Sequence, residues 1–119
     1  QMLSKSTDGT LVKTDEQNNI IGWSSFGPSR DDDGADKGEL YAIYLLSDYW
    51  GMGYGRSLMK SSESLIIDMG FSTITLWVLE LNIRTRRFYE KSGYQHDKTE
   101  KQIEIGGVLL NELRYKKTI

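Results

Sequence analysis

One stretch of the sequence constrains the fold more than any other: a strand, a glycine-rich turn, a helix and a second strand follow one another within residues 39–79. Residues 39–46 (ELYAIYLL) are almost continuously apolar, which predicts a strand buried on both faces. A turn over 47–55 (SDYWGMGYG) leads into a helix from Tyr54, and residues 73–79 (TITLWVL) have strong β character. This order, with its short return, predicts a right-handed parallel crossover.

The helix after the turn has a two-sided pattern. Apolar residues recur along it at helical spacing, and Gly70 is a good C-terminal stop. We therefore expect one face to be buried and the opposite face to be solvated. The expected buried face comprises Leu58, Met59, Leu65, Ile66 and Met69, and the expected solvated face comprises Lys60, Ser61, Glu63, Ser64 and Asp68.

Shorter elements flank this unit. Residues 1–9 are polar and without period, which predicts a frayed terminus, and residues 27–38 have a loop composition. Asn82 is the expected N-cap of a second helix, and Gly106 with Gly107 is typical of a hairpin turn. The remaining expected strands are 11–13, 20–26, 94–98, 101–105 (interrupted near Thr99) and 108–116, with the second helix over 83–92. The 119 residues predict one domain.

Composition excludes several kinds of chemistry. The chain has no cysteine and a single histidine, His96, so cysteine nucleophiles, disulfides and paired-histidine zinc motifs are excluded. We expect no metal. The net charge of −2 argues against nucleic-acid binding. The longest apolar run (40–46) is too short to span a bilayer, and no leader opens the sequence, so we expect a cytoplasmic protein without a membrane partner.

Charge is unevenly distributed along the chain. Residues 1–50 carry four basic and nine acidic side chains, whereas residues 51–119 carry eleven basic and eight acidic ones. The acidic excess is greatest in the loop with Asp31, Asp32, Asp33 and Asp36. One interpretation is a solvated acidic loop. The other is a site entrance that attracts a cationic substrate, while the basic half holds an anionic cofactor.

Gly51, Gly53 and Gly55 lie between a buried strand and the start of a helix. Glycines allow a ligand to approach the backbone closely, and the free N–H groups of a helix start favour an anion such as phosphate. Arg56 stands where a Walker loop needs lysine and where the dinucleotide fingerprint needs glycine, so both of these are excluded. A plain tight turn is the alternative to a phosphate site.

Two segments together are more specific. The run Trp50-Gly51-Met52-Gly53-Tyr54-Gly55 resembles the (Gln/Arg)-x-x-Gly-x-(Gly/Ala) pyrophosphate loop of the GNAT superfamily of N-acetyltransferases. NIRTRRFYEKSGY, which starts at Asn82, resembles that family's Asn-x-x-Ala-x-x-Phe-Tyr-x-x-x-Gly-(Phe/Tyr) segment. Trp50 and Thr85 depart from the usual residues. The resemblance implies an α/β (α+β) fold: a mixed, mostly antiparallel sheet with a central parallel splayed pair and flanking helices. Residues 1–119 then form one domain without the family's first strand and two helices.

The resemblance also implies roles for particular residues. The strand backbone at Ile43, Tyr44 and Leu45 would pair with pantetheine, and the Leu45 N–H would polarise the acetyl carbonyl. The backbone of Gly51, Met52, Gly53, Tyr54, Gly55 and Arg56 would hold the pyrophosphate, and Asn82 the pantetheine arm. Tyr89 would act as general acid toward sulfur and Glu39 as general base.

Each role has a structural alternative. Tyr89 would otherwise cover the helix–sheet seam, Asn82 would serve only as an N-cap, and Glu39 would be a strand-end residue facing water. His96 is expected to be solvated or packed. Trp77 stands where ribosomal-protein acetyltransferases of the family have a base glutamate, which weakens that substrate assignment.

The leading hypothesis is therefore an acetyl-CoA-dependent N-acetyltransferase that acts on a primary amine, favoured to be a small cationic one. The first alternative is a non-catalytic acyl-CoA-binding or regulatory module. The second is a protein or peptide N-acetyltransferase. A homodimer is compatible with the resemblance.

Overall fold

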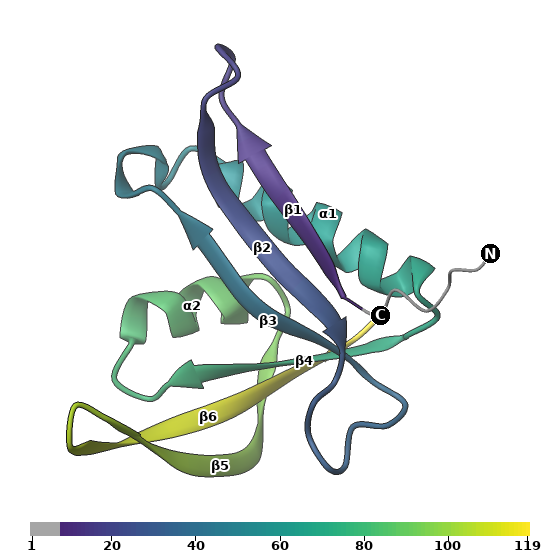
Figure 1. The fold of residues 1–119 in the computed structure, drawn as a ribbon, viewed down its shortest axis with the longest axis vertical. Helices are drawn as coiled ribbons and strands as arrows, with labels where there is room; N and C mark the ends of the chain where they lie inside the picture. Colours follow the sequence, from purple (N-terminus) through teal and green to yellow (C-terminus); the bar gives the residue numbers. More distant parts are fainter. Residues whose placement is uncertain (1–7) are drawn as a thin grey trace.

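The structure is a computed structural model that describes residues 8–119. The described residues form one sheet of strands accompanied by two α-helices (Figure 1). The expected frayed terminus falls largely on residues 1–7, outside the described residues, but Gly9 already belongs to a strand. In chain order the elements are β1 (Gly9–Thr14), β2 (Ile20–Pro28), β3 (Gly38–Leu45), a 3₁₀ turn (Ser47–Tyr49), α1 (Tyr54–Asp68), β4 (Thr73–Leu79), α2 (Ile83–Lys91), β5 (Gln95–Ile105) and β6 (Val108–Thr118).

The strands form one sheet in the order β1-β2-β3-β4-β6-β5. All neighbouring strands are antiparallel except β3 and β4, which pair in parallel. The predicted fold class is therefore confirmed, and β3 and β4 form the expected parallel pair with α1 between them in the chain. β5 is continuous, but its register shifts between His96 and Glu100, and Lys98 has a φ of 69°. This irregularity accounts for the interruption predicted near Thr99.

The main core lies between the sheet and α1. Phe26 and Leu40 from β2 and β3, and Ile74 from β4, pack with Met59 and Ile66 of α1. Ser24 on β2 also contacts α1, because its hydroxyl lies 2.6 Å from that of the buried Ser62. These contacts fix the middle of α1 against the face of the sheet formed by β2, β3 and β4.

The predicted division of α1 into two faces was wrong at three positions. Leu65 and Met69 are each 37% exposed, whereas Glu63 is buried. The Tyr94 hydroxyl donates to Glu63 Oε2 at 2.9 Å, and Lys117 Nζ lies 3.1 Å from the same oxygen. A carboxylate with these two partners can be buried, and helical periodicity cannot indicate partners that come from elsewhere in the chain.

The prediction that β3 is buried on both faces was correct only at its start. Gly38, Glu39 and Leu40 are buried, but Tyr44 is 50% exposed. The change follows from the sheet, because β4 diverges from β3 and leaves the second half of β3 without a neighbour on that side.

Candidate functional site: a forked sheet edge beside a glycine-rich turn

The parallel pair at the centre of the sheet is very short. Among the described residues, β3 and β4 pair only at Gly38 with Ile74 and at Glu39 with Thr75. Beyond these pairs the two strands separate, and α2 lies in the angle between them in the view of Figure 1. We call this opening the fork. It leaves backbone groups of β3 free for another partner.

Hydrogen bonding shows which groups of β3 face the fork. The Leu46 N–H donates to the Ile21 carbonyl on the β2 side at 2.8 Å, and Tyr44 pairs with Trp23. Because backbone groups alternate along a strand, those of Ile43 and Leu45 point to the opposite edge, toward the fork. The backbone of Ile43 and Leu45 is therefore available to a ligand in the fork, and their pairing with pantetheine stays a prediction. The backbone of Tyr44 faces β2 instead, and its exposed ring lies beside Trp23 with centroids 6.5 Å apart.

The glycine-rich turn connects the end of β3 to α1. Gly51 and Gly53 have φ values of 77° and 90°, and a Cβ at either position would meet nothing within 4 Å. Gly53 is the N-cap and provides no side-chain cap. Within the part of the chain described, the N–H groups of residues 54–56 have no hydrogen-bond partner. The turn therefore presents open backbone and unpaired donors at a helix start, which suits an anion.

Trp50 connects this turn to both sides of the fork. Its indole Nε1–H donates to the Leu45 carbonyl at 2.9 Å, and the Arg84 guanidinium lies 4.1 Å above its ring. Arg84 belongs to the first turn of α2. The contact brings the glycine-rich turn close to the start of α2, where Asn82 is located. Asn82 is exposed, and its Oδ1 accepts from the Thr85 N–H at 3.3 Å, so the predicted N-cap is confirmed.

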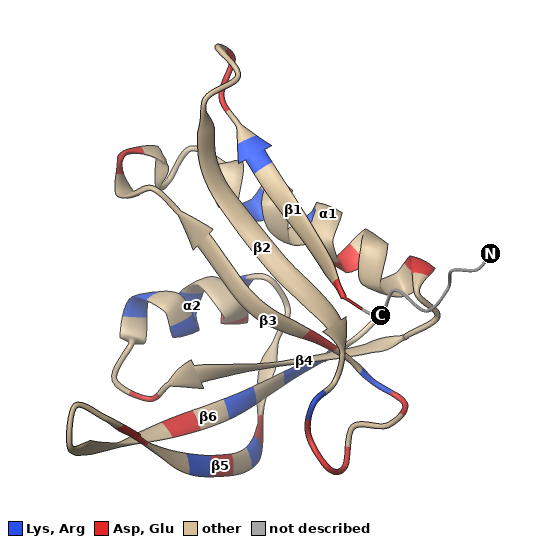
Figure 2. Ribbon diagram, in the orientation of Figure 1, with Lys and Arg blue, Asp and Glu red and all other residues tan. Residues whose placement is uncertain are grey.

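A crevice of about 400 Å³ lies between α1 and α2, next to the turn. Figure 2 shows several blue segments, which mark Lys and Arg, along the ribbon of α2. One carboxylate, Glu63, also lines the crevice, and it already pairs with Lys117. The crevice therefore carries excess positive charge and suits an anionic ligand. Its lining cations are Arg56, Lys60, Lys91 and Lys117.

Tyr89 lies on the face of α2 that packs against the core, between Tyr94 and Tyr115. It is 6% exposed, and burial raises its pKa to about 12. Its hydroxyl has no hydrogen-bond partner among the described residues, yet it is not fully enclosed. Tyr89 therefore covers the helix–sheet seam, as the structural alternative predicted. Its phenol is also protonated at physiological pH and able to donate a proton.

Glu39 stands at the base of the fork, opposite Thr75. It is buried, and its Oε1 accepts from the Arg30 N–H at 2.9 Å. Burial raises the pKa of its carboxyl group, which the Arg30 contact only partly offsets. The alternative of a strand-end glutamate facing water is thus wrong. A buried carboxyl with a raised pKa has the properties expected of a general base.

Two of the four aspartates in the acidic loop between β2 and β3 pair with a single arginine. Arg114 of β6 binds Asp33 in a bidentate pair at 2.7 and 2.9 Å and contacts Asp31 at 3.3 Å. Its Nε–H also donates to Asp97 at 2.6 Å. Figure 2 shows this acidic loop near the blue segment of β6. The loop is therefore neither simply solvated nor a freely charged entrance.

Trp77 is a residue that sequence reasoning did not place in the site. Its Nε1–H donates to the Asp31 carboxylate at 3.1 Å, and Lys101 Nζ lies 4.1 Å above its ring. The alternation of β4 puts Trp77 on the same face as Thr75, and thus on the face of Glu39. Strand alternation is the sequence feature that could have indicated this position of Trp77. His96, in contrast, stacks on Tyr115 with centroids 5.9 Å apart, which confirms the packed alternative.

Two further findings concern the described residues. Neither helix there is both long and apolar enough to cross a membrane. Residues 8–119 also contain no cluster of three acidic or histidine side chains arranged to hold a metal ion.

The fold is a mixed sheet whose central parallel pair forks beside a glycine-rich helix start, an arrangement that suits an anionic ligand. The sequence matches the acetyltransferase (GNAT) family over residues 1–94. The chain belongs to this family.

Similar proteins agree with this assignment. The chain is 38% identical over 111 residues to the uncharacterized N-acetyltransferase YuaI of Bacillus subtilis, which covers 92% of this chain and 62% of that protein. It is 32% identical over 88 residues to the mycothiol acetyltransferase of Propionibacterium freudenreichii. That match covers 72% of this chain and 27% of that protein. The chain thus spans less than two thirds of these relatives.

A solved structure shows the same fold. The PaiA N-acetyltransferase of Thermoplasma acidophilum, in complex with coenzyme A, superposes with a TM-score of 0.76 at 22% identity. The match covers 98% of this chain and 64% of that protein.

Proposed function

We propose that this protein is an acetyl-CoA-dependent N-acetyltransferase that modifies a primary amine, favoured to be small and cationic. The observation that carries the proposal is the fork: β3 and β4 separate beyond Glu39 and Thr75, beside a helix start with free N–H groups. An extended ligand can pair with the free edge of β3 while its phosphates reach the turn. Family membership and the coenzyme A complex of a protein with this fold support the same conclusion.

The residues present fit the donor. The backbone over 51–56 would hold the pyrophosphate, and the cationic crevice between α1 and α2 extends the favourable charge beyond it. The free edge at Ile43 and Leu45 would pair with the amides of pantetheine, and Asn82 would contact the same arm. The indole of Trp50 already uses the Leu45 carbonyl, so pantetheine must share or replace that hydrogen bond.

Acetyl-CoA would supply the acetyl group as a thioester. The amine nitrogen forms a bond to the acetyl carbon, and the bond from that carbon to sulfur breaks. Glu39 takes one proton as the ammonium becomes the attacking amine, and Tyr89 donates its proton to the departing sulfur. Nitrogen loses a second proton as the amide forms, and this proton restores the Tyr89 phenol. A backbone N–H on the free edge of β3, at Leu45 in the assignment by resemblance, stabilises the charge on the carbonyl oxygen.

Distances along β3 define how Glu39 takes part. Leu45 is six residues from Glu39, which is about 20 Å in an extended strand, and Ile43 is about 13 Å away. Direct proton transfer requires a separation of about 3 Å. The proposal therefore places water molecules between the amine and Glu39. Ile43 is the nearer of the two residues whose N–H points into the fork.

The test has two stages. Calorimetric titration with acetyl-CoA should show binding, and a thiol-release assay across an amine panel should then show turnover. Absence of binding at about millimolar acetyl-CoA would contradict the proposal. Binding without thiol release for any amine or peptide would indicate a non-catalytic module, whereas release only with peptides would indicate a protein-modifying enzyme.

A further inference from the structure

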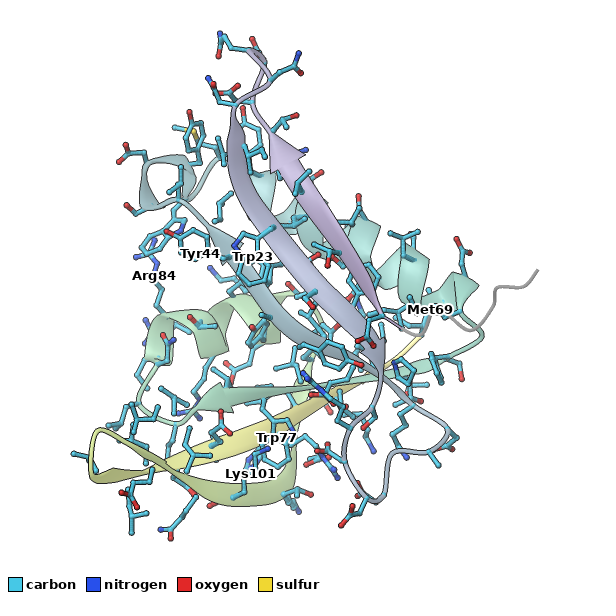
Figure 3. The ribbon with its side chains drawn as sticks, viewed as in Figure 1. Trp23, Tyr44, Met69, Trp77, Arg84 and Lys101 are labelled. Atoms are coloured by element: carbon cyan, nitrogen blue, oxygen red, sulfur yellow. The ribbon has the colours of Figure 1, made fainter. Side chains whose placement is uncertain are left out.

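We propose that the ring of Trp77 binds an ammonium group of the acceptor that does not itself react, and that Lys101 occupies this position when no acceptor is bound. This inference rests on the proposed function and extends it, because it makes the acceptor a diamine or polyamine. Figure 3 labels both side chains, which lie together at β4 and β5.

The first observation is that the ring already holds an ammonium. Lys101 Nζ lies 4.1 Å from the centroid of Trp77, well within the range of a cation–π contact. The ring itself is fixed, because its Nε1–H donates to both oxygens of Asp31 at 3.1 Å. Trp77 is therefore an oriented aromatic surface of the kind that recognises ammonium ligands.

The second observation is that Lys101 is weakly held. Its side chain is 46% exposed, and its ion pair is with Glu112 at 3.8 Å. Exposed ion pairs of this length stabilise little, so an ammonium from solution can replace the lysine.

The third observation is the charge around the ring. Two cations lie over the ring, Lys101 at 4.1 Å and the Arg114 guanidinium at 5.7 Å from its centroid. Between them these cations pair with four carboxylates, those of Asp31, Asp33, Asp97 and Glu112, so negative charge is in excess in this cluster. When Lys101 leaves, this excess of negative charge increases. An ammonium restores the balance, whereas a neutral or anionic group does not.

The fourth observation places the ring near the reaction. Thr75 pairs with Glu39 at the base of the fork, and Trp77 follows two residues later on the same face of β4. A cation–π contact stabilises the charged form of an amine and so opposes its deprotonation. The reacting amine, which must lose a proton, therefore belongs toward Glu39, and a second ammonium of the acceptor belongs on Trp77.

The experiment compares 1,4-diaminobutane with butylamine, which has the same chain length and one amine. Thiol release would be measured for the wild type and for Lys101→Met, which removes the competing ammonium. We expect Lys101→Met to lower KM for the diamine about threefold to tenfold and to leave KM for butylamine and acetyl-CoA unchanged. Lys37→Met, which removes a half-buried lysine of the acidic loop that pairs with Asp36, is the matched control and should change none of these values.

Trp77→Phe and Trp77→Leu isolate the ring, because both lack the indole N–H and only the first keeps an aromatic face. KM for the diamine should rise in both, and about threefold further in the leucine variant. Equal changes for the diamine and butylamine, or a higher KM for the diamine in Lys101→Met, would overturn the proposal.

Direct calorimetric binding of 1,4-diaminobutane to the free protein separates this inference from the proposed function. Tighter diamine binding by Lys101→Met supports the ammonium site even if acetyl-CoA does not bind. Acetyl-CoA binding with diamine affinity independent of Lys101 and Trp77 would leave the proposed function standing and reject the site.

Discussion

Tyr89 and Glu39 are both buried, and burial raises the pKa of each side chain. For the phenol, the raised pKa of about 12 keeps the proton in place at all physiological pH values. For the carboxyl, it favours the protonated form in the folded protein, which makes the group a better acceptor once ionised. The same physical cause thus prepares one side chain to donate a proton and the other to accept one.

Replacement of Tyr89 by phenylalanine tests the acid. We expect Tyr89→Phe to lower kcat on the order of 100-fold, the usual contribution of a positioned general acid. The melting temperature should change by less than about 2 °C, because the hydroxyl makes no hydrogen bond within residues 8–119. Steady-state kinetics and thermal unfolding measure the two effects.

Tyr94→Phe is the matched control. It removes a buried hydroxyl that donates to Glu63, so it should lower the free energy of unfolding by about 1–3 kcal/mol and leave kcat within about twofold. If Tyr89→Phe retained full turnover, the acid assignment would be wrong.

Glu39→Gln tests the base. This variant should gain stability at neutral pH, whereas Tyr94→Phe should lose it. The folded pKa of Glu39 lies above the unfolded value, so its contribution to stability is present at low pH and is lost as pH rises through the folded pKa. At pH 7 the glutamine variant should therefore be more stable than the wild type. The difference should vanish below about pH 4, near the unfolded pKa.

In the same variant, kcat/KM at pH 7 should fall by about 100-fold, and the acidic limb of the pH–rate profile should disappear. Urea unfolding at several pH values and pH-dependent kinetics check both parts. An unchanged pH–rate profile would remove Glu39 from the mechanism.

At the scale of elements, the important unit is the glycine-rich turn with the start of α1. Gly53 and Gly70 lie at opposite ends of this helix, and both have positive φ (90° and 103°). A Cβ at either position would meet nothing within 4 Å. They therefore form a matched pair in which only the location relative to the proposed phosphate site differs.

We expect Gly53→Ala and Gly70→Ala each to lower the free energy of unfolding by about 1–2 kcal/mol, the cost of a left-handed conformation for alanine. Only Gly53→Ala should also weaken acetyl-CoA binding, by about tenfold, because relief of the strain turns the free N–H groups away. Chemical denaturation and calorimetry measure the two properties. Equal acetyl-CoA affinity in both variants would indicate a plain tight turn.

At the scale of the whole molecule, Arg114 joins parts of the chain that are far apart in sequence. It holds Asp33 of the β2–β3 loop, which is 81 positions away, and Asp97 of β5. The same loop supplies the Arg30 N–H to Glu39. The position of the proposed base therefore depends on an ion-pair cluster at the opposite arm of the fork.

Arg114→Met should lower the free energy of unfolding by about 3–5 kcal/mol, because the nearly buried Asp97 loses its cation. Amide hydrogen exchange in residues 29–37 should become much faster. Lys37→Met, which removes an exposed pair with Asp36, is the control and should change stability by less than about 1 kcal/mol. Unchanged exchange in the loop of Arg114→Met would show that other contacts hold it.

Comparison with the sequence predictions separates local from distant causes. The crossover, both helices and the N-cap at Asn82 were predictable because periodicity, glycine stops and capping depend on neighbouring residues. The burial of Glu63 was not, because its partners Tyr94 and Lys117 come from later elements. The roles of the candidate catalytic residues remain predictions, although the structure places Glu39 and Tyr89 in environments that suit them.

The sequence by itself determined the order of the elements, the glycine-rich turn at a helix start and the family resemblance. These are properties of short segments, in which each residue's conformation is set by its neighbours. Only the tertiary structure decided where β3 and β4 part, which backbone groups of β3 are free, and that Arg114 binds two aspartates of the acidic loop. Those features arise when segments separated by tens of residues are packed together, and the free energies that select them are not encoded in any local pattern.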